Sequence, residues 1–188
     1  MRTVYIGMGS NLPSPAGPPA ATIAAGIGQL ASLGRIVCRS ALYVTDPVGY
    51  ADQPSFINAV VGLETGLAPR ELLSRLLDVE RAFGRDRSSG IQNGPRTLDL
   101  DILLMGDLTI SEPGLEIPHP HLAERAFVLV PLNEIAPQVV VPRHEMTVAQ
   151  LLHKLLESSE GQMHAVVPMQ THNARAGSGG GLSGAGAA

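Results

Sequence analysis

The chain has 188 residues, a net charge of −4 and 44% hydrophobic residues, which suggests one soluble domain with a single core. Aromatic residues make up only 3%, so aliphatic side chains must fill that core. The negative charge argues against a nucleic-acid-binding face, which needs clustered Lys and Arg. No apolar run approaches the ~20 residues that span a bilayer, and no signal-like segment opens the chain. With one cysteine, Cys38, and no disulfide partner for it, we expect a cytoplasmic protein without membrane contact.

The first part of the chain alternates between strand and helix patterns. A short apolar run predicts a strand over 4–8, and the prolines of 13–19 predict a loop. A helix is expected next, with Gly34 as its C-cap glycine. Its apolar positions recur at helical spacing: Ile23, Ile27, Leu30 and Leu33. Two further strands are predicted, over 35–44 and over 56–63.

A second helix and a fourth strand follow. Pro69 is a suitable first-turn residue for the helix. The apolar stripe of this helix comprises Leu72, Leu73, Leu76, Leu77 and Phe83. The polar stretch 84–94 predicts a mobile loop, and the strand that carries Asp99 and Asp101 comes next. A Gly-Asp turn then suggests that this strand forms a hairpin with 108–110.

The last part of the chain begins with an irregular segment, 118–121, before a helical run through Leu122 and Phe127. Thr147 and Gln150 have the spacing of a capping box and predict the start of another helix. The apolar positions of that helix are Val148, Leu151, Leu152 and Leu155.

The order strand, helix, strand, strand, helix, strand is the split βαβ pattern of ferredoxin-like folds. We therefore expect an α+β protein whose sheet is covered by helices and which carries extra elements at its C-terminal end. One domain is expected over 1–167. The Gly/Ser/Ala-rich stretch 168–188 is predicted to be a disordered tail, because it cannot bury a core.

The segment 94–104 is the most informative part of the sequence, and it reads Gly-Pro-Arg-Thr-Leu-Asp-Leu-Asp-Ile-Leu-Leu. In a strand, Asp99 and Asp101 point to one face and their apolar neighbours point to the other. Two like charges ~7 Å apart on one strand face repel each other. Hard divalent cations would relieve that repulsion, because carboxylate oxygens are ligands that Mg²⁺ prefers. A solvated strand edge is the alternative interpretation.

Arginines near this strand suggest a bound phosphate. Arg96 can form a plain ion pair with the acids or hold a phosphate, because its guanidinium fits phosphate oxygens. Arg85 and Arg87 stand in the glycine-containing loop, where positive charge suits a lid that closes on phosphates. The chain has no P-loop motif, so ATP would have to bind in another way. His119 lies between two prolines, and no histidine spacing supports a zinc site.

The segment 94–104 closely resembles the signature of the 6-hydroxymethyl-7,8-dihydropterin pyrophosphokinases, a family of folate-biosynthesis enzymes. Further segments resemble the family in order and spacing: 9–12, 52–59, Glu80 with Gly84-Arg85, 117–119, and 125–127 with Pro131-Leu132. The resemblance extends from about residue 3 to residue 160. It implies Mg²⁺-dependent transfer of pyrophosphate from ATP, as co-substrate, to the hydroxymethyl group of the pterin, with release of AMP.

The resemblance also implies a role for each site residue. Asp99 and Asp101 would hold two Mg²⁺ ions against the ATP phosphates, and Asp99 is a candidate to orient or deprotonate the acceptor hydroxyl. Arg85 and Arg96 match the phosphate-contacting arginines and complete the catalytic set. Further ATP-site positions are Arg87, His119 and Arg125. The pterin-pocket positions are Asn58, Phe127, Phe56, Thr45 and Val48.

Three positions depart from the family pattern. Asn93 stands where the family often has tryptophan, Pro120 replaces an aromatic residue, and Asp46 stands where a second proline is expected. Two other functions remain open: a non-catalytic ferredoxin-like binding module, and a metal-dependent phosphohydrolase that uses the same acids. For the pyrophosphokinase, the expected partners are the two small-molecule substrates.

Overall fold

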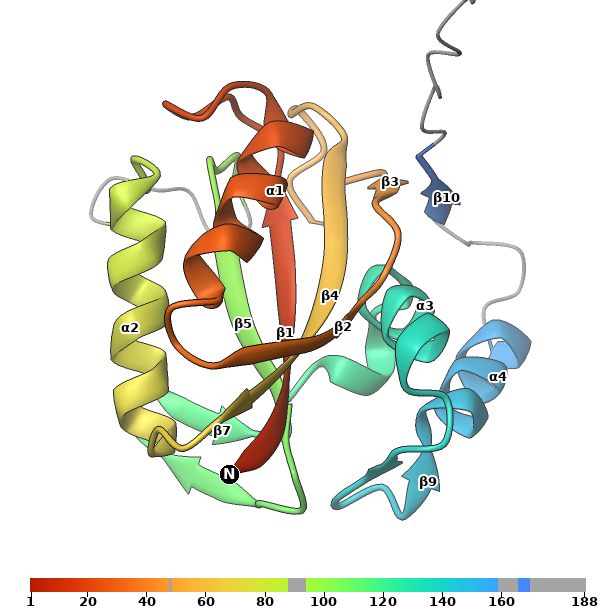
Figure 1. Cartoon of the computed structure of the whole chain (residues 1–188). Coiled ribbons are helices and arrows are strands. Elements are labelled where there is room, and N and C mark those ends of the chain that lie inside the picture. Colours follow the sequence, from red (N-terminus) through yellow and green to blue (C-terminus); the bar gives the residue numbers. More distant parts are fainter. Residues whose placement is uncertain (48, 88–93, 159–165, 170–188) are drawn as a thin grey trace, which may run out of the picture.

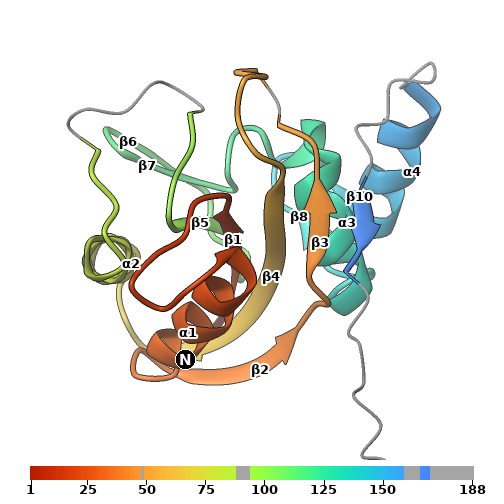
Figure 2. The ribbon, with the colours of Figure 1, turned by 90° about the horizontal axis from the view of Figure 1, so that it is seen from above.

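The structure is a computed structural model and describes residues 1–47, 49–87, 94–158 and 166–169. Its centre is an antiparallel sheet with helices on both faces (Figures 1 and 2). The strands of this sheet are β1 (Arg2–Ser10), β2 (Arg35–Arg39), β3 (Tyr43–Thr45), β4 (Phe56–Thr65), β5 (Asp99–Met105) and β10 (Val166–Pro168). Their order is β10-β3-β4-β1-β5, and β2 pairs with the far end of β4.

The helices are α1 (Pro19–Leu30), α2 (Pro69–Ala82), α3 (Ala126–Ile135) and α4 (Val148–Ser158), with a 3₁₀ turn over Leu122–Glu124. Two small hairpins, β6 (Ile110–Glu112) with β7 (Leu115–Ile117) and β8 (Val140–Val141) with β9 (Met146–Thr147), lie outside the main sheet. None of the helices that the structure describes has the length and apolar character needed to cross a bilayer.

The connectivity confirms the ferredoxin-like α+β fold. β1 lies between β4 and β5 and is antiparallel to both, and the β2–β3 segment flanks β4 on its other side. This arrangement follows from two strand–helix–strand units whose helices, α1 and α2, both return over the same face of the sheet (Figure 2).

Each face of the sheet has its own apolar core. On one face, Val4, Ile6 and Met8 of β1 pack with residues of α1 and α2. On the other, Val60 of β4 and Leu103 of β5 pack with residues of α3 and α4. The side chains of successive strand residues thus alternate between two helix layers.

Two predictions in the first part of the chain are wrong. The predicted strand 35–44 is divided into β2 and β3, because the Ser40 hydroxyl accepts the Val60 N–H while the Ala41 N–H turns away to Glu134. Gly34 is also not the C-cap glycine of α1, since that helix ends at Leu30 and its C-cap residue is Ala31. Gly34 instead brings the turn against β4.

Two predictions in the second part are also wrong. The turn after β5 is present at Gly106, which has a φ of 56°, but residues 110–112 pair with β7 and not with β5. Gly114, with a φ of 76°, forms the turn of this separate hairpin. The helical run through Leu122 and Phe127 is interrupted at Arg125, whose extended backbone separates the 3₁₀ turn from α3.

The capping box at the start of α4 is confirmed. The Thr147 N–H donates to the Gln150 side chain at 2.8 Å, and the Gln150 N–H donates to the Thr147 hydroxyl at 3.2 Å. Strand β10 was not predicted, and its pairing with β3 adds Val166–Pro168 to the edge of the sheet. Residues 170–188 of the expected tail lie outside the described residues.

Replacing Gly34 by alanine should destabilise the fold, because a Cβ there would lie 2.2 Å from the carbonyl oxygen of Glu64. Overpacking of this kind typically costs about 1–3 kcal/mol. The matched control is Gly28→Ala in α1, where a Cβ meets nothing within 4 Å. This control should stabilise the protein by ~0.5–1 kcal/mol, because alanine has the higher helix propensity. Urea unfolding measures both effects, and a Gly34→Ala midpoint equal to that of the wild type would contradict the close approach.

Candidate active site

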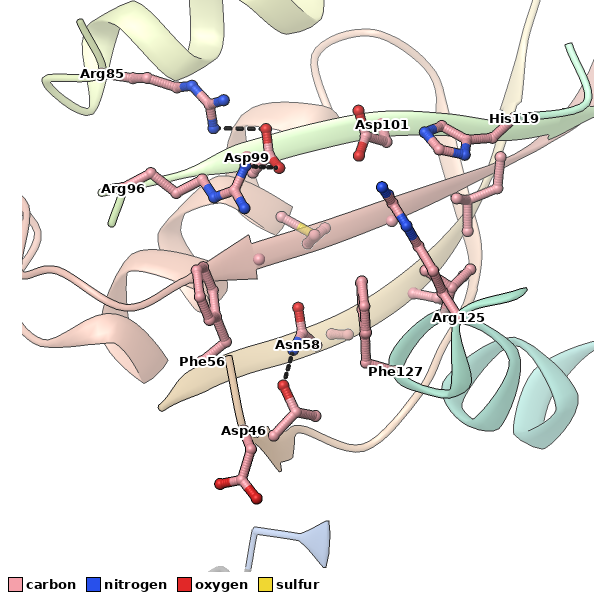
Figure 3. A pocket seen from close by; sticks show the side chains of 18 of the residues that line it. Asp46, Phe56, Asn58, Arg85, Arg96, Asp99, Asp101, His119, Arg125 and Phe127 are labelled. Atoms are coloured by element: carbon pink, nitrogen blue, oxygen red, sulfur yellow. Dashed lines mark hydrogen bonds and ion pairs between the residues drawn. The ribbon is translucent and has the colours of Figure 1, made fainter. Parts of the chain in front are cut away.

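A cavity of about 290 Å³ opens on the α3 side of the sheet, where β1 ends and β5 begins (Figure 3). Eleven of the predicted site residues line it: Thr45, Phe56, Asn58, Arg85, Arg87, Arg96, Asp99, Asp101, His119, Arg125 and Phe127. Val48, the other predicted site residue, lies outside the described residues. The fold therefore brings together residues that are far apart in the chain.

The predicted alternation along β5 is confirmed. Asp99 and Asp101 both line the cavity, whereas Leu100 is 2% and Ile102 is 5% exposed in the core under α1 and α2. Because a strand reverses its side-chain direction at each residue, the core contacts of the leucine and isoleucine fix both acids on the cavity face.

The charges on the two acids are balanced differently. Arg85 Nη1 lies 2.5 Å and Arg96 Nη1 lies 2.9 Å from the carboxylate oxygens of Asp99. Burial and the neighbouring charge of Asp99 raise the pKa of Asp101 to about 6, although the positive charge of Arg125 acts in the opposite direction. Asp99 is therefore ion-paired with two arginines, whereas Asp101 has a raised pKa.

Arg96 is held in place from its backbone. Its N–H donates to Asn11 Oδ1 at 2.8 Å, and its carbonyl oxygen accepts the N–H groups of Asn11 and Leu12. The guanidinium stands over the Phe56 ring at 5.1 Å, and its buried Nε has no hydrogen-bond partner among the described residues. An anion in the cavity would supply the missing acceptor.

Asn11 is a positioning residue that the sequence analysis did not single out. Its Nδ2 donates to Gln53 Oε1 and to the Pro54 carbonyl, both at 3.0 Å, so it joins the loop before β4 to the backbone of Arg96. Its side chain is almost fully buried. The sequence signal for Asn11 was its place as the first polar residue after a strand, in the Gly-Ser-Asn turn.

Glu80 is the second residue that was missed as part of the site. It lies four residues after Leu76 and eight after Leu72 on α2, so it falls on the helix face that the core covers. Burial raises the pKa of this carboxyl group, against the effect of the Arg85 charge. A glutamate on the apolar face of a helix was the sequence signal.

His119 lies at the opposite side of the acid pair from Arg96 (Figure 3). Its N–H donates to the Leu103 carbonyl at 2.9 Å, and its Nδ1 accepts the His121 N–H at 3.1 Å. Burial, followed by the charge of Arg125, lowers its pKa to about 4. The imidazole is therefore neutral near pH 7, and Nε2 carries the proton because Nδ1 is an acceptor.

The other end of the cavity is aromatic. Phe56 and Phe127 stand on either side of Asn58 (Figure 3). Asn58 Nδ2 donates to Thr45 Oγ1 at 2.6 Å, which leaves Oδ1 available to the cavity as an acceptor. A Cβ on Gly9 would lie 3.0 Å from that oxygen, so the glycine keeps the floor open. A flat, polar heterocycle fits such a setting, because rings can stack on its faces and an amide can contact its edge.

Of the departures from the family pattern, only Asp46 is placed at the cavity by the part of the chain that the structure describes. Asp46 lines the cavity, and Figure 3 shows its carboxylate directed away from Asn58. Pro120 is not among the lining residues, and Asn93 lies outside the described residues.

The acid pair fits Mg²⁺. The part of the chain that the structure describes has no cluster of three or more His, Cys, Asp or Glu side chains that could hold a metal ion. Mg²⁺ does not need such a cage, because it usually binds one or two carboxylates and takes its other ligands from water and phosphate. A cation between Asp99 and Asp101 would also offset the neighbouring negative charge that, after burial, raises the pKa of Asp101.

Comparison with known proteins identifies relatives over most of the chain. Residues 5–137 match the family model described as 7,8-dihydro-6-hydroxymethylpterin-pyrophosphokinase (HPPK). The chain is 45% identical over 144 residues to a 2-amino-4-hydroxy-6-hydroxymethyldihydropteridine pyrophosphokinase of Pseudomonas aeruginosa, an alignment that covers 76% of this chain and 85% of the relative. It is 43% identical over 146 residues to a protein of the same name from Haemophilus influenzae, covering 78% of this chain and 89% of the relative.

A solved structure has the same fold. The wild-type HPPK-DHPS of Plasmodium falciparum with pteroate matches with a TM-score of 0.66 and 17% sequence identity, over 86% of this chain. The match spans 43% of that longer chain. The family model, the two bacterial relatives and the shared fold together show that this chain belongs to the 7,8-dihydro-6-hydroxymethylpterin-pyrophosphokinase family.

Proposed function

We propose a residue-level mechanism for the reaction that this chain catalyses as a member of its family. The reaction transfers pyrophosphate from ATP to the hydroxymethyl group of 6-hydroxymethyl-7,8-dihydropterin, releases AMP and serves folate biosynthesis. One observation carries the assignment. A single cavity has Asp99, Asp101 and three arginines along one side and two phenylalanines and an amide across from them, with the Arg96 guanidinium reaching over the Phe56 ring. The charged end suits a polyphosphate, and the aromatic end suits a pterin.

Asp99 and Asp101 are the metal ligands in this proposal, and two Mg²⁺ ions are assigned to them. When bound, the metal ions supply positive charge to the phosphate oxygens on which negative charge accumulates during transfer. The support is the pairing of two hard-oxygen donors on one strand face with a raised pKa for Asp101.

Arg85 and Arg96 contact the ATP phosphates. Both guanidinium groups already lie at Asp99, and Arg96 Nε is a buried donor without a partner among the described residues. Phosphoryl transfer requires mainly positioning and charge neutralisation, which arginines provide without giving up a proton. Arg87 is assigned to the same nucleotide.

His119 and Arg125 complete the ATP site. Since the imidazole is neutral with its proton on Nε2, it acts as a hydrogen-bond donor to the nucleotide and not as a second cation. Arg125 brings its charge to the same side of the cavity, with its guanidinium 5.6 Å from the Phe127 ring centre.

The pterin is assigned to the aromatic end. Phe127 and Phe56 stack on its faces, and the free Oδ1 of Asn58 accepts from its N–H edge, with Thr45 fixing the amide. Val48 is also assigned to this pocket and lies outside the described residues.

Transfer forms a bond between the pterin hydroxyl oxygen and the β-phosphorus of ATP and breaks the bond from that phosphorus to the α-phosphate oxygen. The hydroxyl proton leaves as the new bond forms, and AMP departs with the bridging oxygen. Asp99 orients the hydroxyl or accepts its proton, because its carboxylate faces the cavity. A cytoplasmic location and a single domain over 1–167 are part of the same proposal. The tail expected from residue 168 begins in β10, where Pro168 pairs with Tyr43, and its residues 170–188 lie outside the described residues.

Asp99→Ala and Asp101→Ala should each lower pterin-dependent AMP release by on the order of 10³-fold. The reason is that either change removes a carboxylate that holds metal and phosphate together. The matched control is Asp107→Ala in the exposed turn after β5, which should keep wild-type turnover. AMP is measured from ATP with Mg²⁺ and the hydroxymethyl pterin, and chelation of Mg²⁺ should abolish it. Near-normal turnover in either cavity variant would contradict the metal assignment, and phosphate release without pterin would indicate a phosphohydrolase.

Asn58→Leu should raise the KM for the pterin by roughly tenfold or more, because a buried acceptor for the ligand is lost. The affinity for ATP, measured by calorimetry without pterin, should stay at the wild-type value. An equal loss of affinity for both substrates would instead show that the variant disturbs the whole cavity.

His119 should remain neutral as the pH falls from 6.5 towards 4. In that interval the unfolded chain takes up a proton that the folded chain does not, so the free energy of unfolding should decrease as the pH is lowered. Imidazole ¹H–¹⁵N correlation spectra measure this state and should show the proton on Nε2. A doubly protonated His119 ring near pH 6 would contradict the prediction.

A further inference from the structure

Glu80 is a buried charge that the proposed mechanism does not use. The residue is 1% exposed and is not among the residues that line the cavity. It shares its helix face with Leu72 and Leu76, both fully buried. A carboxylate in such a position is unfavourable unless it is paired and hydrogen-bonded, so its partners indicate what it does.

One partner is the backbone of β5. The Leu100 N–H donates to Glu80 Oε1 at 2.8 Å. β5 is the last strand of the sheet and pairs only with β1 in the part of the chain that the structure describes, so this N–H on its outer edge has no strand partner. Leu100 is the residue between Asp99 and Asp101. The glutamate therefore ties α2 to the backbone from which both acids project.

The other partners are two arginines of the site. Arg87 donates from Nε at 3.0 Å and from Nη2 at 2.7 Å to Glu80 Oε2, and Arg85 Nε lies 3.6 Å from the same oxygen. Both arginines also approach Asp99. The buried carboxylate of Glu80 thus contacts both the strand that carries the two acids and the segment that carries Arg85 and Arg87.

The exposure of the two ends of the ion pair differs. The Arg87 side chain is 52% exposed and lines the cavity, whereas the carboxylate that holds it is buried. A guanidinium has five donors, so a group anchored on one edge can still meet an anion. This arrangement orders a long side chain before a ligand arrives, and so lowers the entropy lost on binding.

We propose that Glu80 is a positioning residue for ATP: its buried carboxylate holds Arg85 and Arg87 at the cavity and fixes the Asp99–Asp101 segment against α2. The proposal rests on the assignment of these arginines to the phosphates. It goes beyond that assignment because Glu80 itself touches neither substrate.

Glu80→Gln tests the proposal with little change of shape. The amide oxygen can still accept the Leu100 N–H, but the negative charge that holds the arginines is lost. The matched control is Glu71→Gln, which removes an exposed carboxylate from the first turn of the same helix. Binding of the α,β-methylene analogue of ATP with Mg²⁺ is measured by calorimetry in the absence of pterin. Affinity should fall about tenfold in Glu80→Gln and stay unchanged in the control.

Steady-state kinetics separate positioning from a purely structural role. For Glu80→Gln the KM for ATP should rise and kcat should fall, while the KM for the pterin stays within about twofold. Unchanged affinity for the ATP analogue, whatever happens to the thermal unfolding temperature, would overturn the proposal. Equal increases in both KM values would overturn it as well, because the whole cavity would then be disturbed.

Two further variants test the same proposal. If Glu80→Gln does not fold, Glu80→Asp keeps the charge and withdraws it by one methylene, and it should also weaken binding of the analogue. In an Arg87→Met background, Glu80→Gln should cost less affinity than in the wild type, because part of its effect acts through Arg87. Full additivity, or wild-type affinity in Glu80→Asp, would overturn the proposal. Analogue binding is measured without turnover, so absence of pterin-dependent AMP release from the wild type would count separately against the proposed function.

Discussion

Two carboxylates on one face of β5 impose the constraint on which the charged end of the cavity depends. Burial, together with the neighbouring charge of Asp99, raises the pKa of Asp101 to about 6. Arg85 and Arg96 pair with Asp99, whereas the charges of Arg125 and Arg96 lower the pKa of Asp101 without cancelling the effect of burial. A fold does not keep such a pair for stability, because replacing both acids by polar neutral groups would remove the repulsion. In the proposed mechanism, cations that enter the cavity with the phosphates would offset this repulsion.

The rest of the sheet holds this pair in place. Leu100 and Ile102 are fixed in the core between the sheet and the helices α1 and α2, so the acids between and beside them cannot turn away. α2 supports the same strand from its outer edge through Glu80. On the cavity face of the sheet, the glycines of β1 leave room for a ligand. A side chain at Gly9 would crowd the Asn58 amide, since its Cβ would lie 3.0 Å from Asn58 Oδ1. The apolar core and the polar site are thus two faces of the same strands.

The accuracy of the sequence predictions depended on the range of the interactions involved. Alternation along 98–102, the Thr147 capping box and the strand–helix order are local patterns, and the structure confirms them. The division of 35–44 depends on Glu134, which lies more than ninety residues away in the sequence. The C-terminal strand β10 likewise exists only because the edge of β3 is available to it. No local pattern contains that information.

The sequence by itself determined the fold class through side-chain spacing and the family through a long local motif. The resemblance to that family then indicated most of the residues that meet in the cavity. Only the tertiary structure decided how their charges are shared. Asn11 and Glu80 have no evident chemistry along the chain, yet in the fold one holds Arg96 and the other holds Arg87. The reason is physical: hydrogen bonds and charge pairs depend on distances of a few ångströms between segments that the sequence separates, and only packing sets those distances.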